Sequence, residues 1–123
     1  MSNEIFIYGN VPSSKNSKVW TGKYLVSSKN VYKYKRHAIK QFMAHRNRFL
    51  KASENKVFPI MVQFTFYREN EQRFDFNNIS QIICDLMVVC RWITDDSYKY
   101  LVPVYNSKVH IDKINPGVKI EIL

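Results

Sequence analysis

The sequence lacks any long apolar run, and it contains only two cysteines. No stretch approaches the roughly 18 consecutive apolar residues that cross a bilayer. The amino-terminal MSNEIFIYGN also lacks the charged and then apolar regions of a secretion signal. We therefore expect a soluble, cytoplasmic protein. Cys84 and Cys90 stand six positions apart in a predicted helix, a spacing that suits neither a zinc pair nor an easy disulfide, so we expect buried free thiols.

Acidic residues are missing from a long segment near the amino terminus. No Asp or Glu occurs from Ile5 to Ser53, and the whole chain of 123 residues carries a net charge of +9. A field of one sign attracts a polyanion, of which nucleic acid is the usual one. A solvated basic face, an acidic protein partner and lipid head groups are the alternatives. The bases of the segment are Lys15, Lys18, Lys23, Lys29, Lys33, Lys35, Arg36, Lys40, Arg46, Arg48 and Lys51.

The composition is that of a folded domain, with 46% apolar and 15% aromatic residues. Alternating apolar residues predict a short strand in EIFIYGNVP, a long strand in KVFPIMVQFTFYREN and two strands after residue 97. A helical pattern runs from about Asn30 to Ala52, and a second helix follows the strand end RFDF. His37 and His45 share the first helix two turns apart, which does not favour metal binding by this pair. We predict one α+β domain over residues 1–123, with a mixed sheet and two main helices.

Four of the ten carboxylates gather in RFDFNNISQIICDLMVVCRWITDD, residues 73–96. Asp75 and Asn77 stand two apart, so on an extended chain both side chains project to one face. Asn77 or Asn78 can then cap the following helix. Along that helix a polar stripe is expected to look into the same pocket as the strand end, and a turn closes the block. The stripe consists of Asn78, Gln81 and Asp85, and the turn carries Asp95 and Asp96.

These carboxylates are candidates for a magnesium site. Magnesium takes oxygen ligands and keeps several waters, so it needs only two or three protein carboxylates. In nucleic-acid cleavage such ions activate water and neutralise charge on the phosphate. The alternative is structural: Asp75 and Asp85 would form salt bridges with Arg73 and Arg91, and the final pair would only fill a turn.

The same block resembles the core motif of the RusA family of Holliday-junction resolvases. That family has an Asp-x-Asp-Asn strand end, a helix with Lys and then Asp-x-Leu, and an Asp-Asp pair after a short hydrophobic turn. Here the corresponding segments are RFDFNNISQIICDLM and WITDDSYKYLVPVY. VPSSKNS resembles the family's Pro-Ser-Lys-Asn stretch, and NPGVKIEIL resembles the closing strand of some phage-encoded members. The similarity runs over most of the chain and is densest from Arg73 to Asp96.

The resemblance implies a crossover junction endodeoxyribonuclease acting in recombination and repair. Family members are magnesium-dependent homodimers that cut two opposed strands of a four-way junction, and manganese can be expected to replace magnesium. Neither a small-molecule cofactor nor a membrane partner is implied. The implied catalytic positions are Asp75, Asn77, Gln81 and Asp96; Asp75, Asn77, Asp95 and Asp96 would form the ligand set, with Asp85 as a supporting acid.

Two positions depart from the family pattern. Asn77 stands where a second metal aspartate is expected, and an amide oxygen can ligate magnesium but supplies no charge. Gln81 stands where a catalytic lysine is expected, and it cannot stabilise a phosphate in the transition state as a cation does. Three interpretations follow: a nearby base such as Lys15 or Lys99 replaces the lost cation, the enzyme is weak, or catalysis is lost and DNA binding is kept.

The expected nucleic-acid contacts lie mainly in the basic segment. SSKN occurs twice, and its Ser, Lys and backbone amide groups are suitable donors to phosphate, although loop chemistry alone also explains them. A third interpretation is a small basic RNA-binding protein of the ribosomal kind, with Tyr24, Tyr32 and Tyr98 stacking on bases. The residues expected to contact nucleic acid are Lys15, Asn16, Lys18, Lys29, Lys33, Arg36, Lys40 and Arg73.

Overall fold

The computed structural model describes residues 3–13, 18–20, 25–27 and 29–123. Lys15 and Asn16 lie outside these ranges, and for Lys18 only the backbone is described. The elements are β1 (Glu4–Tyr8), β2 (Lys18–Trp20), β3 (Leu25–Ser27), α1 (Lys29–Ser53), β4 (Ile60–Arg68), α2 (Phe76–Val89), β5 (Leu101–Tyr105), β6 (His110–Ile111) and β7 (Gly117–Ile122).

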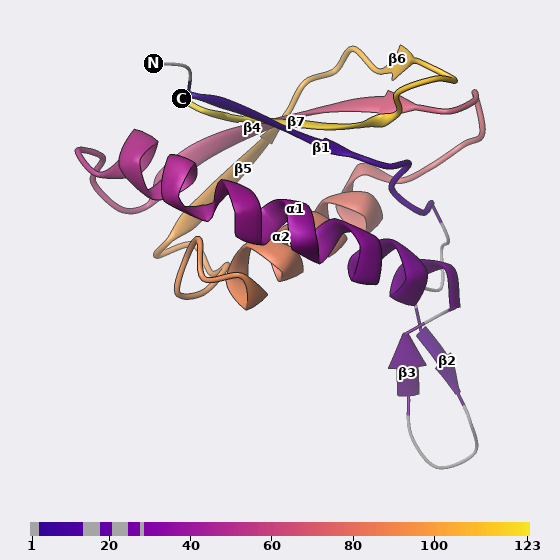
Figure 1. Ribbon diagram of the computed structural model, residues 1–123, viewed down its shortest axis with the longest axis horizontal. Helices are drawn as coiled ribbons and strands as arrows, with labels where there is room; N and C mark the ends of the chain where they lie inside the picture. Colours follow the sequence, from indigo (N-terminus) through magenta and orange to yellow (C-terminus); the bar gives the residue numbers. More distant parts are fainter. Residues whose placement is uncertain (1–2, 14–17, 21–24, 28) are drawn as a thin grey trace.

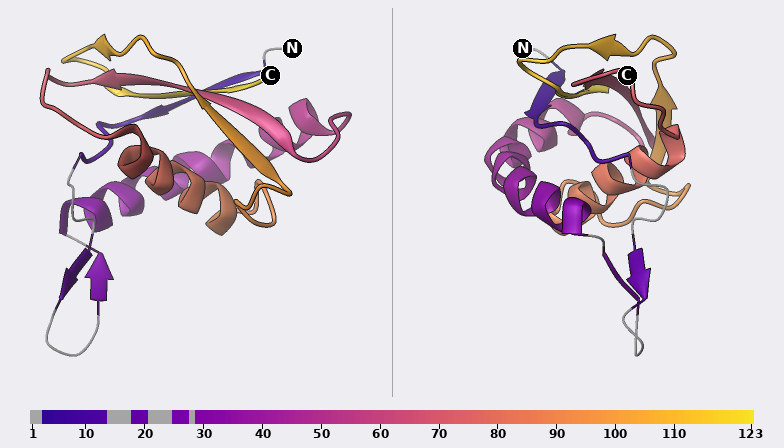
Figure 2. Two further views of the ribbon diagram at one scale, coloured as in Figure 1. Left: turned by 180° about the vertical axis from the view of Figure 1, so that it is seen from behind. Right: turned by 90° about the vertical axis from the view of Figure 1, so that its right-hand side faces the viewer.

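The main sheet has five strands in the order β1-β7-β4-β5, with β6 paired to the end of β4. β7 runs antiparallel to both β1 and β4, whereas β5 and β6 run parallel to β4. Both helices lie on one face of this sheet, and the small β2-β3 hairpin projects away from it (Figures 1 and 2). The mixed sheet and the two main helices predicted from the sequence are confirmed.

The central strand β4 shows why the sheet has one covered face. Val62, Phe64 and Phe66 are fully buried toward the helices, and Met61 on the other face is exposed. This alternation follows from the two-residue period of a strand. Pro59 stands directly before β4, where a missing N–H breaks no ladder hydrogen bond.

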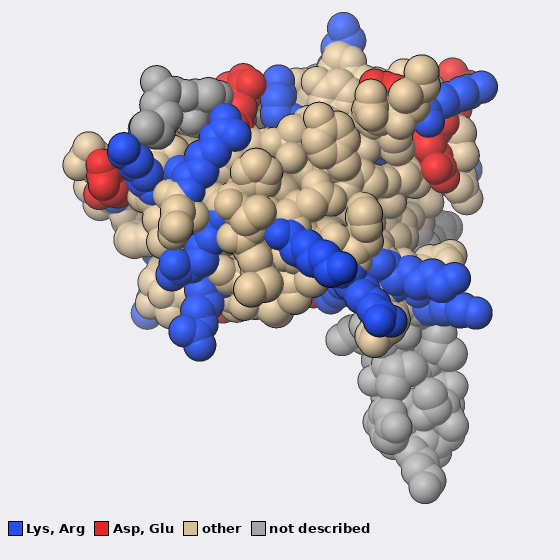
Figure 3. All heavy atoms as spheres, viewed as in Figure 1, with Lys and Arg blue, Asp and Glu red and all other residues tan. Residues whose placement is uncertain are grey.

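α1 combines a buried stripe with a basic one. Val31, Tyr34, Ala38, Phe42 and Phe49 are buried against the sheet and α2, as the helical spacing of these apolar residues predicts. On the outside, four bases recur at intervals of three or four residues, and all of them are exposed. This basic stripe consists of Lys29, Lys33, Arg36 and Lys40. In Figure 3, Lys and Arg side chains cross the face of the molecule over α1, and acidic side chains show mainly near its margins.

The start of α2 differs from the expected strand end. β4 stops at Arg68, and Asp75 is the N-cap of α2, whose carboxylate accepts a hydrogen bond from the Asn77 N–H at 2.8 Å. Asn77 therefore lies in the first helical turn, and the expectation that Asp75 and Asn77 project to one face of an extended chain was wrong. The expectation that Asn77 or Asn78 caps the helix was also wrong, because Asp75 satisfies the free amide first.

The end of α2 places the Asp95–Asp96 turn. Arg91 takes a left-handed conformation (φ 60°), and the next amide, that of Trp92, bonds back to the Met87 carbonyl. The Trp92 indole donates to the Phe42 carbonyl of α1 at 2.7 Å and stacks on Phe49. Trp92 is thus a packing residue, and it ties the turn to α1.

The two cysteines and the carboxy-terminal strands are further features that the sequence predicted. Cys84 and Cys90 are both buried and free, as predicted. The carboxy-terminal region forms three strands, β5, β6 and β7, rather than two, because the short β6 pairs only with the last residues of β4. Neither α1 nor α2 has the length and apolarity needed to span a membrane.

Candidate active site

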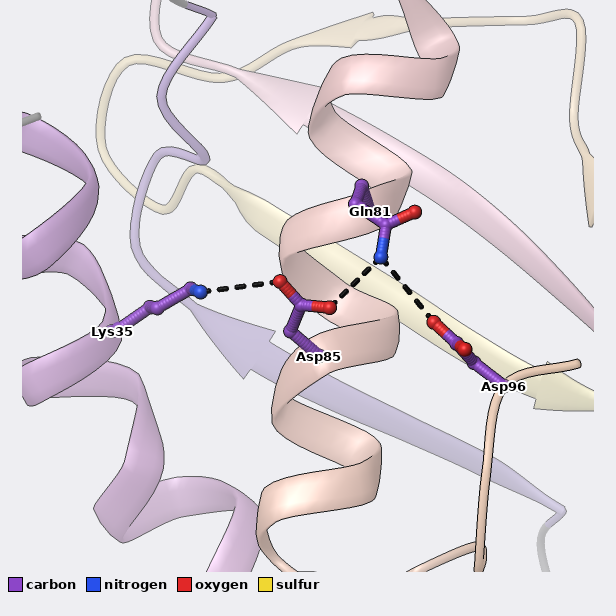
Figure 4. A network of polar contacts seen from close by, with 4 residues as sticks. All are labelled: Lys35, Gln81, Asp85 and Asp96. Atoms are coloured by element: carbon purple, nitrogen blue, oxygen red, sulfur yellow. Dashed lines mark hydrogen bonds and ion pairs between the residues drawn. The ribbon is translucent and has the colours of Figure 1, made fainter. Parts of the chain in front are cut away.

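One polar network joins α1, α2 and the turn before β5 (Figure 4). The Gln81 side-chain amide donates to Asp85 Oδ1 at 2.8 Å and to Asp96 Oδ2 at 3.3 Å. Lys35 Nζ of α1 donates to the other oxygen of Asp85 at 3.2 Å. The network therefore holds two carboxylates, one amide and one ammonium group in contact. We call Lys35, Gln81, Asp85 and Asp96 the acidic network.

Local structure explains how this network assembles. Gln81 and Asp85 stand four residues apart on α2, where side chains of one face meet. Asp96 arrives on the turn that Trp92 fixes against α1. The Asp95 carboxylate instead accepts the Asp96 N–H at 2.9 Å. Asp95 is therefore tied to its own turn by this bond.

A second polar group surrounds the amino-terminal end of α2. The Tyr105 hydroxyl of β5 donates to Asn77 Oδ1 at 3.2 Å, and its ring stacks on Phe76 with centroids 5.3 Å apart. The Asp75 carboxylate caps the helix at the same end. These residues line a cavity of about 1030 Å³ that also includes Arg73 and Ser13. The Asp75 carboxylate already compensates the partial positive charge of the helix terminus, so Arg73 is the cation in the lining of this cavity.

The contacts gather some of the sequence-predicted site residues and leave others apart. Gln81, Asp85 and Asp96 meet, and Asp75 meets Asn77. Within the described ranges, Asp75 and Asp96 share no hydrogen bond, and no three His, Cys, Asp or Glu side chains cluster closely enough to hold a metal ion. The alternative salt bridge between Asp85 and Arg91 was also wrong, because Asp85 pairs with Lys35.

The donor chemistry of the acidic network nevertheless fits magnesium. Asp85 and Asp96 present hard oxygen atoms, which magnesium prefers, and the ion needs only one or two carboxylates beside its waters. The Gln81 amide nitrogen now lies between the two carboxylates and donates to both. Gln81 is exposed, so its side chain can rotate away at small cost when a cation takes its place.

The cation of the site is one that sequence reasoning missed. Lys15 lies outside the described residues, and Lys99 is exposed without an ion pair to these carboxylates. Lys35 supplies the charge from α1, 50 residues before Asp85. Its place directly after the buried Tyr34 puts it at the edge of the core stripe, which is a weak signal for a contact with α2. The partner itself depends on how the two helices pack.

The negative charges of the acidic network also affect the buried Cys84 thiol. Burial raises the pKa of the Cys84 thiol to about 11, a hydrogen bond with Ser80 opposes this, and the negative charges of Asp96 and Asp85 add to the rise. Cys84 therefore stays protonated and inert at neutral pH. It serves as packing beneath the network rather than as a nucleophile.

Five of the predicted nucleic-acid contacts have exposed side chains in the structure. Lys29, Lys33, Arg36 and Lys40 form the basic stripe of α1, and Arg73 lies exposed at the amino-terminal end of α2.

Comparison with known proteins adds no identification: no protein-family model matches the chain, and a search of curated proteins finds no similar sequence.

Proposed function

We propose that this chain is a magnesium-dependent endonuclease for branched DNA, of the kind that the RusA resemblance implies, acting as a homodimer in recombination and repair. The acidic network is the observation that carries the proposal. Two carboxylates from separate segments, Asp85 and Asp96, meet beside the ammonium group of Lys35. A basic helix that can hold DNA lies next to them.

Magnesium would be held by oxygen atoms of Asp96 and Asp85, with Asp75, Asn77 and Asp95 as the further donors that the resemblance implies. When bound, the ion supplies an activated water and neutralises charge on the phosphate. The chain's own residues do the rest. The basic stripe binds and orients the DNA backbone, and Lys35 places a fixed positive charge at the carboxylates, where it can stabilise charge that develops on the phosphate.

A nicking assay on a synthetic four-way junction tests the proposal. With magnesium or manganese, the purified protein should nick two opposed strands symmetrically, and sedimentation velocity should show a dimer. Asp96→Asn should lower the nicking rate by at least about 100-fold while junction affinity stays unchanged. Glu121→Gln, on the open face of the sheet, is the matched control. Binding without nicking under every divalent metal would reject the catalytic part of the proposal.

Junction binding without cleavage is the second candidate function. It is favoured by the fact that Gln81 and Lys35 already satisfy carboxylate oxygens within the protein. This function predicts salt-sensitive DNA affinity and no metal requirement. A calorimetric titration decides between the two, because a magnesium site that disappears in Asp96→Asn supports the enzyme.

A further inference from the structure

A second cavity, of about 890 Å³, lies between β1, the first turns of α1 and the segment after β4. Lys33 and His37 of α1 line one side, and Arg73 lines another. All three side chains are exposed, and none of them makes a hydrogen bond or ion pair within the part of the chain that the structure describes. They are free to donate to a ligand.

The charge of this cavity favours an anion. Lys33 and Arg73 are cationic, and Glu69 is the acidic residue among its described lining. Behind the lining, the buried guanidinium of Arg68 donates to the Val11 carbonyl and lies 5.0 Å from the centre of the Phe74 ring. Positive groups thus outnumber the one carboxylate. Neutral amides of Asn10 and Asn30 also line the cavity.

Tyr34 packs behind the cavity. Its ring lies against Gly9 beside His37, and Tyr34 is only 7% exposed. The Tyr34 hydroxyl is enclosed and has no hydrogen-bond partner among the described residues. Such a group costs free energy in the folded protein, and a ligand in the cavity does not reach it.

The cavity adjoins the one at the amino-terminal end of α2. Ser13 and Arg73 line both this cavity and the one that contains Asp75 and Asn77. A strand whose phosphate lies at the amino-terminal end of α2 would therefore pass Arg73 and enter the second cavity. We infer that the cavity is a phosphate subsite, formed by Lys33, His37 and Arg73, for a backbone phosphate next to the strand region at the amino-terminal end of α2. This inference rests on the proposed function for its ligand, a DNA strand.

Removing the two permanent charges tests the subsite. The double variant Lys33→Gln/Arg73→Gln should weaken junction binding about tenfold or more and lower the salt slope of log K by about 1, because the one phosphate contact that is lost contributes about 0.9. The matched control is Lys51→Gln/Lys56→Gln. Lys51 stands about 27 Å farther along α1 than Lys33 at the usual helical rise. Equal losses in the two double variants would overturn the inference.

Tyr34→Phe is a control for the residue that packs behind the cavity. Loss of an unpartnered buried hydroxyl should raise the melting temperature of the free protein. Because the hydroxyl is enclosed, the same variant should bind the junction as tightly as the wild type. A several-fold loss of affinity would contradict this placement of the hydroxyl behind the subsite. Ethylation interference should also show one backbone phosphate whose modification blocks binding to the wild type but not to the double variant.

The proposed function and the subsite can fail separately. If the wild-type chain binds junctions and the double variant binds equally well, only the subsite is rejected. If the wild-type chain binds no DNA, the proposed function fails, and titration with inorganic phosphate then decides the subsite alone. Phosphate binding that is lost in Lys33→Gln/Arg73→Gln and kept in the control supports an oxyanion site, and no binding rejects it.

Discussion

Lys35 gives the acidic network a charge that Gln81 cannot supply. The pair with Asp85 is partly exposed, at 31% and 40% of the two side chains, so it contributes only about 0–1 kcal/mol to folding. Its value would instead lie in chemistry, where a fixed cation near a phosphate can change a rate by about 100-fold or more. A charge swap between the two helices distinguishes these roles.

We predict that Lys35→Gln lowers the single-turnover nicking rate by about 100-fold with little change in stability. Adding Gln81→Lys should restore at least a tenth of the rate, because a lysine there stands four residues before Asp85 and in reach of Asp96. Lys51→Gln serves as the charge-matched control. A nicking rate of Lys35→Gln equal to that of the wild type would show that Lys35 only connects the two helices.

The buried Cys84 thiol makes the free energy of unfolding vary with pH in the alkaline range. Its folded pKa is raised to about 11 by burial, whereas an unfolded thiol titrates near about 8.5. Between these values the unfolded state loses its proton and the folded state keeps it, so stability falls as pH rises. We predict a loss of about 1–2 kcal/mol between pH 8 and pH 10 in urea unfolding. Cys84→Ala should lack this part of the slope; an unchanged slope would contradict the assignment to Cys84.

At the scale of elements, the cap of α2 has two separable parts, a hydrogen bond and a charge. Asp75→Ala removes the acceptor of the Asn77 N–H, so the free energy of unfolding should fall by about 1 kcal/mol. Asp75→Asn keeps an equally good cap and should cost only a few tenths of a kcal/mol. Urea unfolding measures both. If the Asp75→Asn variant is folded but does not nick DNA, the carboxylate takes part in the cleavage reaction. If the variant nicks DNA at the wild-type rate, Asp75 acts only as the helix cap.

The same element shows where sequence patterns succeed and fail. The 25 residues of α1 were predicted within about one residue at each end, because its apolar stripe repeats over many turns. The start of α2 was misplaced by local competition, since Asp75, Asn77 and Asn78 are all good caps. The contact between Gln81 and Asp85 follows from helical spacing. The contact of Lys35 with Asp85 does not, because it depends on the packing of two helices.

At the scale of the whole molecule, the net charge of +9 does not by itself define a binding face. Its distribution does, because Lys29, Arg36 and Lys40 lie along one exposed side of α1. Sequence alone predicts this stripe from its spacing, but not that α1 lines the cavity of about 890 Å³ together with Arg73, because that depends on how α1 packs beside β1 and the segment after β4. If DNA binds to this face, the positions of the basic residues, rather than the total charge, control DNA affinity.

Two triple variants with equal charge loss test this prediction. Lys29→Gln/Arg36→Gln/Lys40→Gln should lower the slope of log K against log salt by about 2–3, because up to three phosphate contacts are lost at about 0.9 each. Lys51→Gln/Lys56→Gln/Lys113→Gln removes the same charge from exposed positions at the far end of α1 and before β7. It should change affinity only weakly, through the long-range field that salt screens. Fluorescence anisotropy with a junction, from about 50 to 200 mM salt, measures both slopes. Equal slopes would mean that DNA meets no particular face, which would remove the basic stripe from the proposed interface.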